Sequence, residues 1–238
     1  MKITVINGTE KRGVTYHFKE IFLQRFKSAE IMEYYLPKDC PSFCAGCTSC
    51  FLKGENTCKD FAYINAIEKS LLQADLIVMT SPAYVMHATG ALKALLDHLA
   101  YRWMPHRPAP EMFKKRAVII TQCLGAGAKS TARDIKHSLS WWGISTIGIF
   151  SSALMNDIVW DNVSEKRRKK LTKKINRLSC RFAKINYAKP ARTKPITKIK
   201  FKMCRFIQKQ VRKKGIAGLD YEYWYKNGWL EKSRPWKS

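Results

Sequence analysis

The sequence predicts a doubly wound α/β domain, in which about five parallel strands form one sheet with helices on both faces. Two observations lead to this prediction. Short runs of β-branched and aliphatic residues recur along the first 150 residues, and segments with apolar residues at helical spacing lie between them. Such alternation is typical of parallel sheets, because each crossover helix returns the chain to the same end of the sheet.

The expected strands are short, continuous apolar runs, as strands buried on both faces usually are. They cover residues 3–6, 31–35, 76–79, 117–121 and 145–150. The helices between them are indicated by apolar residues three or four positions apart: Phe18, Ile21, Phe22 and Phe26; Ile64, Ile67 and Leu71; Leu92, Leu95, Leu96 and Leu99; Ile135, Leu139 and Trp142. Such sheets bind ligands beyond the carboxyl ends of their strands, so we expect the functional motifs there.

Two basic helical segments follow the fifth strand. A closing helix is expected after a potential cap at Ser164, with a stripe formed by Leu171, Ile175, Leu178, Phe182 and Ile185. Pro190 and Pro195 interrupt the helical pattern, and a second amphipathic segment runs from Ile196 to Lys214. We therefore predict a domain over residues 1–188, with a cysteine-rich insertion at 40–58, and a basic, mainly helical C-terminal extension over 189–238.

Positive charge is concentrated in the C-terminal part. The chain has 238 residues and a net charge of +26; residues 1–150 hold 19 basic and 12 acidic side chains, and residues 151–238 hold 25 and 6. This surplus favours an anionic partner, either a membrane surface or nucleic acid, so a binding protein without enzymatic activity is one hypothesis. A solvated helix face or a contact with a partner subunit are the alternatives. No zinc-finger or ribonucleoprotein pattern supports nucleic acid.

The composition excludes several classes of protein. An apolar fraction of 46% with 12% aromatic residues is sufficient for a folded core. No apolar run approaches the roughly 18 residues of a membrane-spanning helix. The first residues enter the first strand directly, which leaves no room for a secretion signal, and we expect a cytoplasmic protein.

The loop after the first strand, residues 7–15, combines glycine and hydroxyl residues ahead of a helix. Such a loop can wrap a phosphate with backbone N–H groups and the positive end of the helix dipole, and Thr9 and Thr15 add hydroxyl groups. A plain strand-to-helix turn with a threonine cap is the alternative. The loop lacks the glycine patterns of dinucleotide and nucleoside-triphosphate sites.

Two further loops are expected beside the first. Pro82 follows the third strand, where it can aim consecutive backbone amides sideways, and Tyr84 offers a flat surface to a planar ligand. The fourth strand ends in a loop that contains Gly125 and Gly127, which allow a close approach of backbone to ligand. The three loops are therefore expected to converge on one crevice.

Together, these segments resemble the flavodoxin-like NAD(P)H-dependent FMN reductase family over residues 1 to about 155. The resemblance is carried by Gly8-Thr9-x-Lys11-x-Gly13-x-Thr15, Ser81-Pro82-x-Tyr84, Gly90-x-Leu92-Lys93-x-x-Leu96-Asp97 and the loop through Gly125 and Gly127. It implies a flavodoxin-like five-stranded sheet with FMN in the crevice. It further implies an oxidoreductase that moves hydride from NAD(P)H to FMN and on to an unknown acceptor, with the chemistry carried by the flavin and no catalytic side chain.

The resemblance also implies which residues contact FMN. Thr9, Lys11, Gly13, Val14 and Thr15 would hold the phosphate; Pro82, Ala83, Tyr84, Val85 and Met86 would border the isoalloxazine ring; Gly125, Ala126 and Gly127 would approach its other edge. Val14 departs from the family pattern, which often has asparagine there, so only a backbone contact is expected from it. A homodimer or larger assembly is also implied, because a second subunit commonly completes the crevice in this family.

Cysteines form the second motif, Cys44-x2-Cys47-x2-Cys50-x7-Cys58. Closely spaced thiolates can surround a compact inorganic cluster, and zinc or a group of reduced thiols are the alternatives. The motif is similar to that of the iron–sulfur flavoproteins, a branch of the same superfamily. This similarity implies a [4Fe-4S] cluster near FMN that exchanges single electrons with a ferredoxin-like partner.

Overall fold

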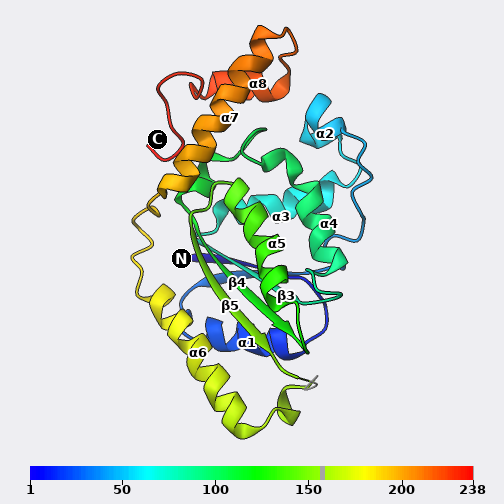
Figure 1. The fold of residues 1–238 in the computed structure, drawn as a ribbon, viewed down its shortest axis with the longest axis vertical. Helices are drawn as coiled ribbons and strands as arrows, with labels where there is room; N and C mark the ends of the chain where they lie inside the picture. Colours follow the sequence, from blue (N-terminus) through cyan, green and yellow to red (C-terminus); the bar gives the residue numbers. More distant parts are fainter. Residues whose placement is uncertain (156–158, 238) are drawn as a thin grey trace.

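The computed structural model describes residues 1–155 and 159–237, and its centre is one five-stranded sheet (Figure 1). The strands are β1 (Lys2–Asn7), β2 (Glu30–Tyr35), β3 (Leu76–Pro82), β4 (Arg116–Cys123) and β5 (Thr146–Ala153). They lie in the order β2-β1-β3-β4-β5, and every neighbouring pair is parallel. The predicted doubly wound fold is therefore confirmed.

Helices cover both faces of the sheet. The main ones are α1 (Val14–Leu23), α3 (Phe61–Gln73), α4 (Gly90–His98), α5 (Ala128–Trp141) and α6 (Glu165–Ala183). Short elements complete the connections: α2 (Ser49–Leu52) and the 3₁₀ helices η1 (Glu55–Thr57), η2 (Ala100–Arg102), η3 (Pro110–Lys114) and η4 (Trp160–Asn162). Ser164 lies at the start of α6 as expected, but its side chain makes no capping hydrogen bond.

The central strand β3 shows why the apolar runs are continuous. Leu76 and Val78 pack in one core cluster with α1 and α6, whereas Ile77 and Met79 pack in another with α3, α4 and α5. All four side chains are fully buried. Full burial of such a side chain contributes about 1.5–3 kcal/mol, so the alternating sides of β3 hold both helical layers on the sheet.

A third cluster attaches the C-terminal extension to the domain. The extension forms α7 (Pro195–Lys213) and α8 (Leu219–Lys226), which Figure 1 shows at the end of the molecule away from the arrowheads of β4 and β5. Phe201 stacks on Trp224 with 4.7 Å between ring centroids, and both pack with Met104 and Phe113 of the domain. The indole N–H of Trp224 donates to the His106 carbonyl at 2.7 Å. The extension is thus a packed part of the fold, and the domain boundary after residue 188 stays a prediction.

None of the helices in residues 1–155 and 159–237 combines the length and the apolar character needed to cross a bilayer.

Replacement of Trp224 tests whether the third cluster holds the extension. Trp224 is fully buried, so Trp224→Ala should lower the free energy of unfolding the extension by about 3–5 kcal/mol. Limited proteolysis should then cleave residues 195–230 faster than in the wild type. The adjacent Tyr225 is 63% exposed, so Tyr225→Ala serves as the control and should leave the cleavage rate nearly unchanged. Equal protection of the two variants would contradict this packing.

Candidate functional site

A cavity opens at the carboxyl ends of β1, β3 and β4. It encloses about 620 Å³, including space open to solvent, and it is lined by Thr9, Lys11, Gly13, Val14, Thr15, Pro82, Ala83, Tyr84, Gln122, Cys123 and Leu124. The first eight of these are residues that the sequence analysis assigned to FMN. The structure therefore brings the loops after β1 and β3 together as expected. The role of each residue as a ligand stays a prediction.

Hydrogen bonds hold the loops after β1 and β3 together. The Gly8 N–H donates to the Thr80 carbonyl at 2.8 Å, and the Thr89 hydroxyl donates to the Gly8 carbonyl at 2.5 Å. A Cβ at Gly8 would lie 2.8 Å from the Thr80 oxygen, a distance that real Cβ atoms essentially never show. Glycine is thus required at this position for the loop after β1 to sit against the end of β3.

The amino end of α1 faces this cavity. The helix begins at Val14, has Gly13 as its N-cap, and has neither a capping side chain nor an acidic residue in its first turn. Its first backbone N–H groups therefore have no side-chain acceptor, and the helix dipole places positive charge there. Thr9 and Thr15 bring hydroxyl groups and Lys11 brings an ammonium group to the same wall. This donor set suits a phosphate group.

Lys19 of α1 is buried and forms ion pairs. The Lys19 ammonium lies 2.7 Å from carboxylate oxygens of both Glu20 and Glu33. Burial acts to lower the pKa of Lys19, but hydrogen bonds with these carboxylates and their charge outweigh it and raise that pKa. Glu33 also accepts from the Asn7 side chain at 3.1 Å. Because Asn7 ends β1, this network connects α1, β1 and β2 directly beneath the first loop.

The loop after β3 contains a tight turn in a strained conformation. Tyr84 and His87 exchange two backbone hydrogen bonds of 2.9 and 3.1 Å, with Val85 and Met86 between them. Both central residues have positive φ, 47° and 70°, which is unusual for residues other than glycine and costs most for a β-branched side chain. The turn is held by Asp134, whose carboxylate lies 3.0 Å from the His87 ring and accepts from the Ala88 N–H at 3.2 Å.

The loop after β4 packs against this turn through Gly127. Gly127 has φ of 102°, and a Cβ there would lie 2.8 Å from the Met86 Cα. Gly125, Ala126 and Gly127, like Val85 and Met86, lie outside the cavity lining. Gln122, Cys123 and Leu124 contribute the lining instead, although the sequence analysis did not assign them. Their residue types carry no distinctive pattern, and only the register of β4 places them there.

Of the four motif cysteines, Cys50 lies in α2 and Cys58 approaches His98 at the end of α4, while Cys44 and Cys47 precede α2 in the chain. Cys44 and Cys47 are exposed, whereas Cys50 and Cys58 are partly buried. Burial and then the charges of the Cys44 and Cys58 thiolates raise the pKa of Cys50, which places these thiols within electrostatic range of one another. Hydrogen bonds with Ser49 lower the pKa of Cys47 and so favour the thiolate form that binds metals.

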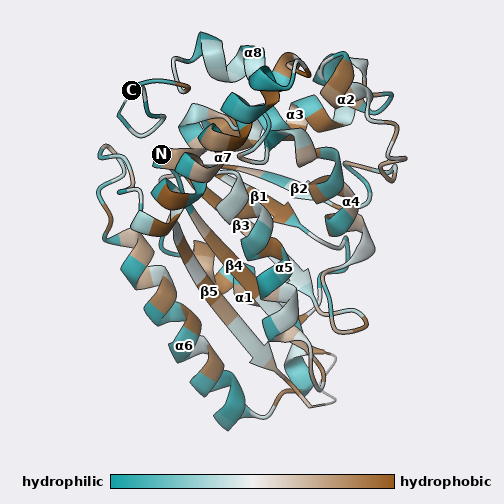
Figure 2. Cartoon of the chain, turned by 45° about the horizontal axis from the view of Figure 1, so that its top comes forward, coloured by the Kyte–Doolittle hydropathy of each residue, from teal (hydrophilic) through white to brown (hydrophobic). Residues whose placement is uncertain are grey.

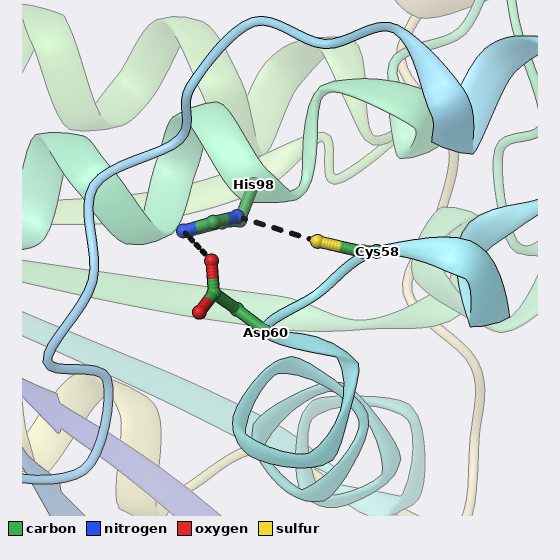
Figure 3. A group of neighbouring side chains, drawn as sticks. All are labelled: Cys58, Asp60 and His98. Atoms are coloured by element: carbon green, nitrogen blue, oxygen red, sulfur yellow. Dashed lines mark hydrogen bonds and ion pairs between the residues drawn. The ribbon is translucent and has the colours of Figure 1, made fainter.

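Cys58 also belongs to a buried polar group that the sequence analysis did not assign (Figure 3). Its sulfur lies 4.0 Å from Nδ1 of His98, and Nε2 of His98 lies 3.1 Å from the Ser42 carbonyl and 3.8 Å from Asp60 Oδ2. Nε2 can donate to the Ser42 carbonyl, which leaves Nδ1 as an acceptor facing the thiol. Asp60 Oδ2 is buried and has no hydrogen-bond partner.

This group has the chemistry of a metal site. One potential ligand atom from each of Cys58, Asp60 and His98 lies within 4.8 Å of the others. Asp60 Oδ2 is buried without a hydrogen-bond partner, and a cation or a buried water could bind to it. No local pattern in the sequence points to His98 or Asp60, because the residues come from opposite ends of different helices and meet only in the fold.

Sequence comparison connects the chain with flavin-dependent reductases. The sequence model of a family described as NADPH-dependent FMN reductase matches residues 1–157. An iron-sulfur flavoprotein of Archaeoglobus fulgidus is 22% identical over 149 residues, which cover 61% of this chain and 65% of that protein. FMN-dependent NADH:quinone oxidoreductase 2 of Pseudomonas putida is 29% identical over 101 residues, which cover 39% of this chain and 51% of that protein. The chain thus spans about half to two thirds of the length of these curated relatives.

Solved structures share the fold. An azoreductase from Bacillus anthracis superposes with a TM-score of 0.58 and 13% identity, covering 77% of this chain and 98% of that one. An FMN-dependent NADH-azoreductase from the same species, solved in complex with FMN, has a TM-score of 0.57 and 15% identity, covering 75% of this chain and 100% of that one. At these identities the similarity shows the flavodoxin-like fold alone.

Substitution of Gly127 tests the contact between the loops after β3 and β4. A Cβ in Gly127→Ala would press on Met86 at a positive φ, so the turn should open. Hydrogen exchange of the Tyr84 and His87 amides, measured by NMR, should then accelerate at least tenfold. Gly125→Ala is the matched control, since its Cβ would meet nothing within 4 Å. Unchanged exchange in Gly127→Ala would show that the loops do not depend on each other.

Proposed function

We propose an FMN-dependent oxidoreductase activity for this chain, because it belongs to the NADPH-dependent FMN reductase family. In this proposal the protein binds FMN at the carboxyl ends of β1, β3 and β4 and accepts hydride from NAD(P)H. The observation that carries the proposal is the convergence of three loops and the uncapped end of α1 on one open cavity.

The donor set fits the phosphate of FMN. Thr9 and Thr15 offer hydroxyl groups, Lys11 offers an ammonium group, and Gly13 and Val14 lie where the backbone N–H groups of α1 begin. No acidic side chain is among the lining residues, so nothing in the wall repels a phosphate dianion. Val14 contributes no polar side chain, and its proposed contact is made by its backbone.

The remaining wall fits a planar, largely apolar ring. Pro82, Ala83 and Tyr84 line it together with Gln122, Cys123 and Leu124. We propose that Val85 and Met86 border the ring from the rim, with Gly127 packed against Met86. Gly125, Ala126 and Gly127 would approach the other edge of the ring. The two-residue turn holds its backbone in one conformation, as a loop that positions a cofactor must.

The residues around the cavity suit a reaction carried by a cofactor. When bound, FMN supplies the hydride and electron chemistry. The lining contains no His, Asp or Glu, and its titratable side chains are Lys11, Tyr84 and Cys123. The Cys123 sulfur is buried and lies 3.7 Å from the Ser152 carbonyl, which makes it part of the cavity floor rather than a nucleophile open to substrate. The protein's part is to bind and orient.

The mouth of the cavity fits closure by a second subunit, and we propose a homodimer or larger homo-oligomer. Tyr84, Val85, Met86, Leu124 and Met155 are exposed around it, and Val85 reaches 94% exposure. An apolar rim of this kind is characteristic of a protein interface.

Thr15→Val tests the proposed phosphate site, because valine keeps the shape of threonine and removes its hydroxyl. Loss of one hydrogen bond to a charged phosphate is worth about 1.5–3 kcal/mol, so the Kd for FMN should rise roughly 10- to 150-fold. Fluorescence titration with FMN measures this change, and riboflavin, which lacks the phosphate, should bind both proteins equally. Thr172→Val on α6 is the control. Protein that cannot be loaded with FMN, or loaded protein whose absorbance is not bleached anaerobically by NADH or NADPH, would refute the proposal.

We also propose that Cys44, Cys47, Cys50 and Cys58 hold a [4Fe-4S] cluster, which supplies single-electron transfer and suits a ferredoxin-like partner. The short spacing of the four cysteines along the chain favours this function, and the charges of Cys44, Cys47 and Cys58 all act on Cys50. Four thiols from one short segment, two of them exposed, are the kind of donor set that such a cluster takes. Cys58 also faces His98 and Asp60, so zinc would compete for the same thiol.

Anaerobic reconstitution distinguishes the two metals. The wild type should bind about four iron and four sulfide per chain, and Cys47→Ala should lose most of both. Cys180→Ala, a substitution of a cysteine outside the motif, should retain them. Stoichiometric zinc without sulfide, abolished by His98→Ala, would contradict the cluster and assign the site to Cys58, Asp60 and His98.

A further inference from the structure

Helix α7 has two apolar faces, and only one of them is covered. Thr197, Phe201, Cys204 and Gln208 are buried at intervals of four, three and four residues, so they form the face that packs on the third cluster. Two polar side chains of this face make hydrogen bonds: the Thr197 hydroxyl lies 2.9 Å from the Ser145 hydroxyl, and Gln208 Nε2 donates to the Pro105 carbonyl at 2.7 Å. This face fixes the orientation of the helix on the domain.

The second face lies in solvent. Ile196, Ile199, Met203, Phe206 and Ile207 are all exposed, at 58, 60, 47, 62 and 40%. We call them the α7 stripe. At 3.6 residues per turn they share one side of the helix, turned away from the buried face. Figure 2 shows brown and teal positions alternating along α7. Ile216, beyond the end of the helix, is also exposed. A contiguous apolar surface of this kind marks an interaction site.

The charges beside the stripe have one sign. Residues 196–214 contain eight basic and no acidic side chains. Lys198, Lys202 and Lys209 are exposed next to the stripe. In the parts of the chain that the structure describes, no basic side chain of α7 forms an ion pair with a carboxylate. The surface that complements α7 is therefore both apolar and anionic.

Charge and polarity together select among the partners. A nucleic acid would neutralise the lysines but leave the stripe in water. A second copy docked stripe to stripe would bring two unpaired basic helices together, which like-charge repulsion disfavours. An anionic bilayer covers both features, because its acyl boundary takes the apolar side chains and its headgroups carry negative charge.

We propose that α7 binds the surface of an anionic lipid bilayer, with the α7 stripe at the acyl boundary and the neighbouring lysines among the headgroups. The helix lies in the plane of the interface and does not cross the bilayer. Since α7 packs at the end of the domain opposite the carboxyl ends of the strands, the candidate cavity stays open to water. This inference does not depend on FMN binding.

Vesicle sedimentation tests the proposal with the full-length protein. Vesicles of phosphatidylcholine with about one third phosphatidylglycerol should bind the protein at least tenfold more tightly than pure phosphatidylcholine, and high salt should weaken this binding. The double variant Ile199→Ser with Phe206→Ser should lower the affinity at least tenfold. Met32→Ser with Ile149→Ser removes exposed apolar side chains elsewhere and should bind like the wild type. Circular dichroism and thermal unfolding check that each variant is folded.

A charge variant and two competing partners complete the experiment. Lys198→Gln with Lys202→Gln and Lys209→Gln should lose affinity for anionic vesicles and show a weaker salt dependence. Three outcomes would overturn the proposal: equal binding to both kinds of vesicle, tighter binding to duplex DNA or RNA that the stripe variant retains, or a change of oligomeric state in the stripe variant without loss of vesicle binding.

Discussion

Strand β3 is hydrogen-bonded on both sides and buried on both faces, and the rest of the structure depends on that constraint. Its register with β1 and β4 brings Thr80 beside Asn7 and Pro82 beside Gln122, so three loops leave the sheet at one edge. Gly8 can then donate to Thr80, and the Thr89 hydroxyl can reach the Gly8 carbonyl. Strand pairing therefore determines where the three loops leave the sheet, and the hydrogen bonds between the loops then shape the cavity.

The candidate site carries conformations that oppose folding. Two non-glycine residues with positive φ cost on the order of 1–3 kcal/mol each, and they persist because Asp134 and Ser130 hold the turn while Gly127 leaves room for it. The Lys19 ammonium is likewise buried, and two carboxylates offset its desolvation. Strain and buried charge thus lie beside the cavity that we propose for the cofactor, where a rigid backbone is most useful for positioning a ligand.

In the C-terminal extension, aromatic side chains make the packing contacts and lysines carry the charge at the surface. Its aromatic side chains pack on Met104 and Phe113 and fix α7 in place. Its lysines other than Lys200 are exposed, and among the described residues none of them forms an ion pair with a carboxylate. The chain has a net charge of +26, and repulsion among these charges destabilises the folded state. An anionic partner would reduce that repulsion. The proposed membrane contact gives the extension a role distinct from the chemistry of the cavity, and the two ends of the molecule can then act independently.

Local patterns alone determined the order of strands and helices, because apolar periodicity depends on neighbouring residues. Short motifs likewise predicted a phosphate-binding loop at Thr9 to Thr15 and a group of closely spaced cysteines. They also located α7, whose boundaries at Pro195 and Lys213 follow from a proline and from helical spacing. Only the tertiary structure decided that Gln122 to Leu124 line the cavity and that His98 faces Cys58. It also decided which face of α7 is covered. These features arise from contacts between residues distant in the chain, and no local pattern encodes which distant partner a side chain will meet.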